Sequence, residues 1–193
     1  MDPLVVADAA AWRTWLDTNE ETSDGVWLIL AKKGTTSPTS LTYAEALDEA
    51  LCSGWIDGQR KGNDETTFLQ RYTPRRARSL WSLRNLDLVA ALIAQGRMRP
   101  RGHSEIEKAQ ADGRWDRAYA GPAAAVAPDD LIAALAEAPG TAERFAALKS
   151  GERYSVLHPI ITAATPKTRA NRIAKQVELL RLSELPAPDA APE

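Results

Sequence analysis

The sequence predicts an α+β fold, in which a small antiparallel sheet flanked by helices is followed by an all-helical C-terminal region. The apolar run Val26–Ala31 has the length and the β-branched and aromatic content of a strand that is covered on both faces. Two further strand-like segments, 55–61 and 66–72, flank a turn at 62–64 and predict a hairpin. Beyond residue 82, apolar residues recur at helical spacing, which favours helices for the rest of the chain.

Capping residues mark the first helices. Asp8 stands just before tryptophans at helical spacing and is a predicted N-cap. Thr42 and Glu45 are spaced as a capping box, in which each side chain bonds to the backbone of the other residue. Gly54 is expected to end the helix begun by Thr42 in the left-handed conformation.

Small residues and prolines over 120–128 predict a linker between two regions. We therefore expect an α+β domain over 1–119, a helical region over 129–182 and a disordered tail over 183–193. Pro159 is expected to disturb the helix that starts near Glu152, since proline cannot donate a backbone hydrogen bond.

Charge and cysteine content exclude several classes of protein. The 24 Lys and Arg residues and 26 Asp and Glu residues give a net charge of -2, so nucleic acid or an acidic membrane would have to be met by a local patch. The single cysteine, Cys52, excludes an intrachain disulfide and a Cys-rich zinc site. The N-terminal residues lack the pattern of a signal peptide, and no apolar run approaches the roughly 20 residues of a membrane span. We expect a cytoplasmic protein without membrane insertion.

The segment 71–84 is the strongest candidate binding feature, with five arginines, two aromatic residues and no acid. Arginine presents a planar, permanently charged fork that suits phosphate or carboxylate, and Trp81 could stack a ring. Alternatively, the arginines pair with acids of the same chain. The candidate partners are Asp57, Asp64, Glu65 and Asp87.

The hairpin should bring the start of its first strand beside the end of its second strand. We therefore expect an aromatic and charged set of side chains to converge on one partly open surface. The members of that set are Trp55, Asp57, Arg75, Arg76 and Trp81. The predicted ligand-binding residues are Trp55, Asp57, Arg71, Arg75, Arg76, Trp81 and Asn85.

A secondary basic site is predicted at the start of the last helix, where Thr165 and Pro166 mark the first turn. Its candidate residues are Lys167, Arg169 and Arg172. Cations are disfavoured at the amino end of a helix by the macrodipole. Either acids from elsewhere in the fold or an anionic ligand must therefore offset them.

No catalytic motif is present: the sequence holds no HExxH, P-loop, GxGxxG or GxSxG pattern. His103 and His158 have no neighbouring ligand pattern, so no metal and no cofactor are predicted. Cys52 follows the apolar face of a helix and is expected to be a buried, inert thiol. No catalytic residue is assigned.

Several segments together resemble the YdeI/OmpD-associated (OmdA) family of bacterial proteins, over nearly the whole chain to about Leu182. The matching segments are 25–28 with 32–33, 41–43, 50–52, 54–58, 71–76, 79–82 with 85, 96–98, 112–115, 118–119, 166–169 and 172–173. The resemblance implies protection against bacteriocins or cationic antimicrobial peptides, and association with an outer-membrane porin. It also implies a front half like that of the YjbR/CyaY proteins, and it supplies no catalytic residues.

The leading hypothesis is a non-enzymatic binding or stress-protection protein that recognises an anionic small molecule or a phosphate-bearing partner. The first alternative is an enzyme that uses the surface around Trp55, Asp57, Arg75 and Arg76 as its active site. The second is a nucleic-acid-associated module, for which the net charge predicts no strong binding. The sequence does not predict an oligomeric state.

Overall fold

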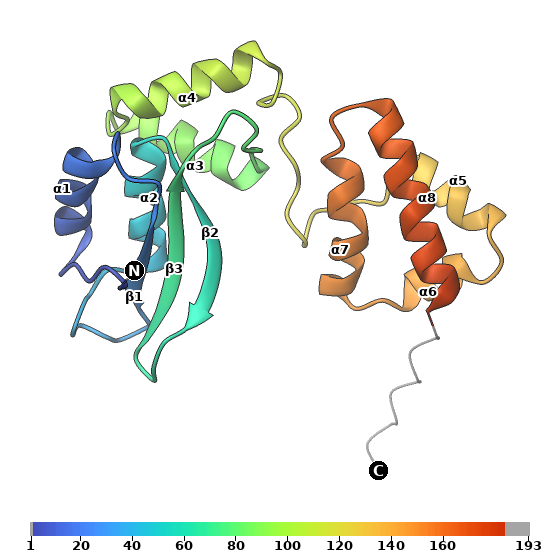
Figure 1. The fold of residues 1–193 in the computed structure, drawn as a ribbon, viewed down its shortest axis with the longest axis horizontal. Coiled ribbons are helices and arrows are strands. Elements are labelled where there is room, and N and C mark those ends of the chain that lie inside the picture. The colour runs from blue at the N-terminus through green and yellow to red at the C-terminus, as the bar shows by residue number, and fades with distance from the viewer. Residues whose placement is uncertain (1, 184–193) are drawn as a thin grey trace. The chain divides into compact units, whose positions relative to one another are not determined.

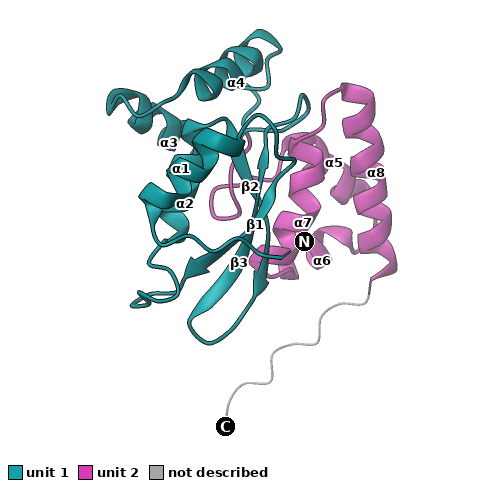
Figure 2. Ribbon diagram, turned by 60° about the vertical axis from the view of Figure 1, so that its left-hand side comes forward, with its two compact units in different colours: residues 1–118 teal, residues 119–193 magenta. Residues whose placement is uncertain are grey.

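The computed structural model describes residues 2–183 of the chain. The chain forms two compact units, one over residues 1–118 and one from residue 119 onward (Figure 2). Residues 120–128, the predicted linker, carry no helix or strand. The predicted disordered tail over 183–193 lies, apart from Ser183, outside the described residues. Within residues 2–183, no helix combines the length and the apolar character needed to cross a membrane.

The first unit confirms the α+β prediction, with a three-stranded antiparallel sheet in the order β1-β3-β2 and helices packed on it (Figure 1). Its elements are α1 (Ala9–Asn19), β1 (Val26–Ala31), α2 (Tyr43–Cys52), β2 (Trp55–Gly62), β3 (Thr67–Pro74), α3 (Leu83–Ala94) and α4 (Pro100–Ala111). In addition, Leu4 pairs with Leu28 as an isolated parallel bridge beside β1.

Strand β1 is less evenly buried than its composition predicts. Leu28 and Leu30 are fully buried, whereas Trp27 and Ile29 on the opposite face are only half-buried. The expectation of a strand covered on both faces is therefore wrong in part. The side chains alternate because successive residues of a strand point to opposite faces.

Strands β2 and β3 form the predicted hairpin. In its turn, Asp64 accepts hydrogen bonds from the backbone amides of Thr66 and Thr67 at 2.8 and 2.7 Å. These bonds and the Thr67 hydroxyl lower the pKa of Asp64 to about 2. Phe68 and Tyr72 are buried on one face, as expected, since they lie four residues apart along β3.

Helix α2 begins and ends as its sequence predicts. Both halves of the Thr42–Glu45 capping box are formed, and Gly54 has a φ of +69° just after the helix. A core of aromatic and aliphatic residues lies where α1 and α2 pack on the sheet. Trp12 contributes to it and also donates from its indole nitrogen to the Ala46 carbonyl at 3.1 Å.

The second unit is helical, as predicted, with α5 (Asp129–Glu137), α6 (Thr141–Ala147), α7 (Ser150–Ile161) and α8 (Pro166–Leu182). It has a hydrophobic core of its own. The core residues are Leu131, Leu135, Phe145, Val156, Leu157, Ile160, Ile173 and Leu180. The expectation that Pro159 disturbs its helix is wrong, because α7 continues through Pro159 to Ile161. Proline has no backbone N–H, so α7 lacks the one hydrogen bond from position 159 to the carbonyl of Ser155, and the rest of the helix is kept.

The packing of α4 on the end of α2 depends on Gly102, because a Cβ there would overlap the Cys52 carbonyl oxygen and lie 2.6 Å from Cε of Met98. We expect Gly102→Ala to lower the free energy of unfolding of this unit by about 2 kcal/mol, the usual cost of overpacking. Urea denaturation followed by tryptophan fluorescence measures this, since all six tryptophans lie in the first unit.

Gly62→Ala is the matched control for this substitution. No atom lies within 4 Å of the Cβ it would add, and Gly62 is in the same unit. Its effect should stay within about 0.5 kcal/mol. Equal effects of the two substitutions would contradict the packing described for Gly102.

Candidate functional site

The predicted binding segment leaves the end of β3 and runs into the first turn of α3; residues 75–84 are here named the arginine loop. Arg75 lies inside it: this residue is 5% exposed, and its guanidinium carbon is 3.4 Å from the centroid of the Trp81 ring. Its Nη1 also donates to the Leu80 carbonyl at 3.0 Å. Trp81, 2% exposed, packs in turn on Trp115 with ring centroids 5.0 Å apart. Arg75 and Trp81 therefore support the loop from within.

Polar contacts hold the rest of the arginine loop in place. The Ser79 hydroxyl accepts from the amide of Arg76 at 2.9 Å, and the Ser79 carbonyl accepts from Nη1 of Arg114 at 2.9 Å. Arg114 is itself buried and held by Asp112 at 2.7 Å. At the far end, Ser82 accepts from the amide of Asn85 and caps α3. The loop is thus a fixed surface feature.

Outward, the loop presents the exposed side chains of Arg76, Arg78 and Arg84. Leu80 and Leu83 lie among them and are 39% and 47% exposed. Within residues 2–183, no carboxylate lies at ion-pair distance from Arg76 or Arg78. The intramolecular pairing considered from sequence is therefore not found for these two arginines.

Asp57 belongs to a polar cluster at the amino ends of α2 and α3, which shares Arg84 with the arginine loop. The Tyr43 hydroxyl donates to Asp57 at 2.8 Å, and Nη1 of Arg84 donates to the same hydroxyl at 3.4 Å. Burial, with the nearby Asp57 carboxylate, raises the pKa of Tyr43 to about 12. Tyr72 pairs with Asp57 across the sheet, and its buried hydroxyl has no hydrogen-bond partner among the described residues.

The structure does not bring the predicted residues to one open surface. Trp55 and Trp81 are buried in the hydrophobic core, which contradicts that expectation. Arg71 faces the opposite side of the sheet from Asp57, because it is the neighbour of Tyr72 in β3. Asn85 is buried under the start of α3. Of the predicted ligand-binding residues, Arg76 alone is fully on the surface, and their binding role stays a prediction.

The predicted secondary basic site is occupied by contacts within the second unit. Arg169 forms a two-bond ion pair with Asp130, at 2.5 and 2.8 Å, and its Nη1 donates to the Ile160 carbonyl at 3.2 Å. Arg172 donates to the Pro159 carbonyl at 2.5 Å. The carbonyls at the end of α7 and Asp130 thus offset the cations at the start of α8. Lys167 remains exposed.

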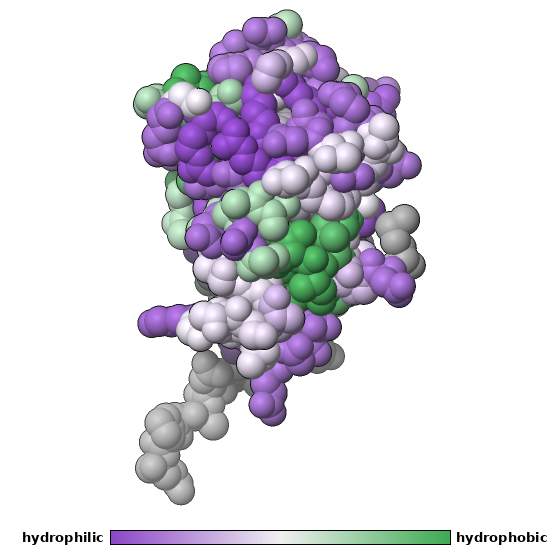
Figure 3. Space-filling model, turned by 90° about the vertical axis from the view of Figure 1, so that its left-hand side faces the viewer, coloured by the Kyte–Doolittle hydropathy of each residue, from purple (hydrophilic) through white to green (hydrophobic). Residues whose placement is uncertain are grey.

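A second group of arginines, which sequence reasoning missed, follows α3. Glu49 is buried near the carboxyl end of α2 and accepts from Arg97 at 2.7 Å and from Arg99 at 2.6 Å. Arg99 also donates to the hydroxyl of Ser53. Hydrophilic residues dominate the face of the molecule at the end that carries α4 (Figure 3). One indication of this group is present in the sequence: arginines alternate at 97, 99 and 101, and the predicted apolar helix before them contains an acid, Glu49.

Potential catalytic groups are few in the described structure. Cys52 is buried, and burial with the charge of Glu49 raises the pKa of its thiol to about 11. Burial likewise raises the pKa of Tyr72 well above its usual value. No group of three or more His, Cys, Asp or Glu side chains within residues 2–183 could hold a metal ion.

The buried position of Glu49 predicts a large effect of its charge on stability. Glu49→Gln should lower the free energy of unfolding of the first unit by about 3 kcal/mol, because it leaves two arginines without their buried counter-charge. Glu21→Gln is the control: Glu21 pairs with Arg101 at 2.6 Å but is largely exposed, so its loss should cost less than about 1 kcal/mol. Urea denaturation of both variants provides the comparison, and similar costs would show that Glu49 is not buried in solution.

The raised pKa of Cys52 predicts an unreactive thiol. In native protein at pH 8, a chromogenic disulfide reagent should modify Cys52 at least about a hundredfold more slowly than in urea, because thiolate is scarce below pH 11 and the side chain is inaccessible. Rapid modification of the native protein would instead reopen the case for a nucleophilic cysteine.

Models of known families match segments in both units. A model described as "Bacteriocin-protection, YdeI or OmpD-Associated" (OmdA) matches residues 124–182, so the expected resemblance is confirmed there but not over the whole chain. A second model, described as "Domain of unknown function (DUF8412)", matches residues 4–105. No curated protein and no solved structure matches the chain. Residues 124–182 are thus similar to the OmdA family, and because the second match spans more than half of the 193 residues, the chain belongs to the DUF8412 family.

Proposed function

We propose that this protein is a non-enzymatic protection protein that binds an anionic ligand on its arginine loop. The observation that carries the proposal is that Arg76 and Arg78 are exposed on a fixed loop with no carboxylate at ion-pair distance among the described residues. The similarity of residues 124–182 to a family described by bacteriocin protection supports a protective role.

The chemistry of the loop favours a phosphate or carboxylate group as the part that is recognised. Guanidinium groups bind such oxyanions through two parallel hydrogen bonds. The amino end of α3, capped by Ser82, adds the positive end of a helix dipole close to Arg84. Exposed Leu80 and Leu83 offer apolar contact beside the cations. The preferred ligand is thus an oxyanion that carries an apolar portion.

Two observations favour binding over catalysis at this surface. Trp55 and Arg75, which the enzyme alternative needs as substrate contacts, are buried. Two ionisable groups beside Asp57, Tyr43 and Tyr72, are phenols whose pKa values are raised by burial, that of Tyr43 to about 12. A general acid or base works best with a pKa near the operating pH. The Tyr43–Asp57 pair therefore fits a structural or binding role.

The nucleic-acid alternative finds less support. Proteins that bind single-stranded nucleic acid combine a basic groove with aromatic rings on which bases stack. Trp81, the tryptophan of the arginine loop, is buried beneath it and presents no such platform. With the net charge of -2, we expect weak binding to RNA at low salt that disappears at physiological salt.

The arginine loop is tested by removing its exposed cations. Relative to the unchanged protein, Arg76→Ala with Arg78→Ala should weaken binding of inorganic pyrophosphate by about tenfold or more, since each charge-assisted hydrogen bond contributes about 1.5 kcal/mol or more. Isothermal titration calorimetry at low and moderate salt gives the dissociation constants.

Arg13→Ala serves as the matched control, because Arg13 is an exposed arginine of the same unit on α1. It should leave the affinity unchanged. The absence of any pyrophosphate binding to the unchanged protein, or equal losses in the control and the double variant, would rule out the proposed site. The fold of each variant is checked by its thermal unfolding.

A further inference from the structure

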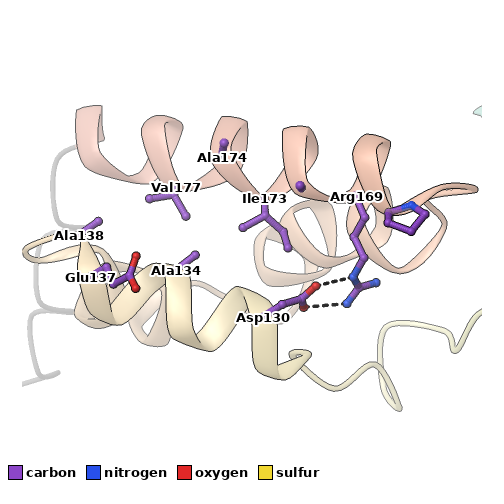
Figure 4. Close-up of a pocket in the computed structure, with 10 residues that line it drawn as sticks. Asp130, Ala134, Glu137, Ala138, Arg169, Ile173, Ala174 and Val177 are labelled. Carbon is purple, nitrogen blue, oxygen red and sulfur yellow. Dashed lines mark hydrogen bonds and ion pairs between the residues drawn. The ribbon is translucent and has the colours of Figure 1, made fainter.

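The second unit contains an open groove between α5 and α8, with a volume of about 590 Å³ (Figure 4). Small and aliphatic side chains form its walls: Ala134, Ala138, Ala170, Ile173, Ala174 and Val177. Leu131 and Leu135 of α5 point instead into the core of the unit. The alanines leave space between the two helices that larger residues would fill. A volume of this size is typical of sites for small organic molecules.

One end of the groove is closed by the Asp130–Arg169 pair (Figure 4). Nε and Nη2 of Arg169 donate to Asp130, and Nη1 donates to the Ile160 carbonyl at 3.2 Å. Arg169 is therefore already engaged on all three nitrogens, and Asp130 is neutralised. The bidentate pair also lowers the pKa of Asp130, which keeps it ionised and matched to Arg169. This end offers no free charge to a ligand.

The other end carries the carboxylate of Glu137, the last residue of α5. Within residues 2–183, no cation lies at ion-pair distance from it. Asp130 and Glu137 are seven residues apart, which is about 10 Å along a helix. The groove thus combines an apolar floor of that length with one unmatched negative charge at a single end.

We propose that this groove binds a small organic cation with an unbranched apolar chain, such as an alkylammonium ion. The ammonium group would lie at Glu137, and the chain would extend over the alanines towards Ile173. An extended octyl chain has about the length of this floor. Burial of the chain supplies affinity, and the carboxylate supplies the preference for a cation. The site lies in a different unit from the arginine loop and favours the opposite charge, so it stands independently of the function proposed above.

The proposal is tested on the full chain with two probes of equal chain length and opposite charge. Octylammonium and octanoate are titrated below their aggregation concentrations, and amide chemical shifts are followed by NMR. Octylammonium should shift the amides of α5 and α8 and bind about threefold or more tightly than octanoate at those residues, a preference in the range of one partly exposed ion pair. Shifts confined to other elements, or an equal affinity for both ions at α5 and α8, would overturn the proposal.

Two substitutions separate the contributions of charge and space. Glu137→Gln should remove the preference for octylammonium, whereas Glu143→Gln, which changes an exposed acid of α6 outside the groove, should keep it.

Ala174→Leu fills the groove and should abolish binding of octylammonium at α5 and α8. Ala142→Leu adds the same side chain at an exposed position of α6 and should leave binding unchanged.

An unchanged preference in Glu137→Gln would remove the role assigned to that carboxylate. Unchanged binding in Ala174→Leu would remove the groove as the site. If Ala174→Leu fails to fold, Ala138→Leu fills the same space from α5 and takes its place in the comparison.

Discussion

The buried carboxylate of Glu49 is the interaction on which the arrangement of the first unit depends. It lies near the carboxyl end of α2, where water cannot solvate it, so its charge must be met by the protein. Arg97 and Arg99 meet it at 2.7 and 2.6 Å, and both belong to the connection between α3 and α4. The ion cluster therefore holds the connection between α3 and α4 against the carboxyl end of α2. Gly102 then allows the backbone of α4 to approach that of Cys52.

The other end of α2 organises the candidate functional surface. Tyr43, the first residue of the helix, bonds to Asp57 of β2 and accepts from Arg84 of α3. The amino ends of α2 and α3 therefore lie together, as do their carboxyl ends through Glu49 and Arg97. The arginine loop, which leads into α3, contacts the chain at both ends of α2: Arg84 donates to the Tyr43 hydroxyl, and the amide of Arg75 donates to the carbonyl of Gly54, just after α2, at 3.0 Å.

Arginine has three different structural roles inside this protein. Arg99 neutralises a buried acid, and Arg75 stacks on Trp81 to support a loop from within. Arg169 in the second unit pairs with Asp130 and also bonds to the end of α7, which resolves the unfavourable position of cations at the start of α8. Arg76 and Arg78 have no such internal role among the described residues and are directed to solvent. The arginines bonded inside the protein are structural, whereas the exposed Arg76 and Arg78 are available to a ligand.

Features that depend on neighbouring residues could be predicted from the sequence. Four such features depend on residues close together in the chain: the Thr42–Glu45 capping box, the left-handed Gly54, the β2–β3 hairpin and the start of α8 at Thr165. Which charged and aromatic side chains are buried depends instead on contacts between distant parts of the chain. Trp81 became buried and Arg76 exposed, although they lie in one segment, because the contact with Trp115 comes from a distant part of the chain. The Glu49–Arg99 pair and the groove between α5 and α8 likewise join residues far apart in sequence. The composition of a segment does not indicate which distant residue it will contact, because that contact depends on the packing of the whole unit.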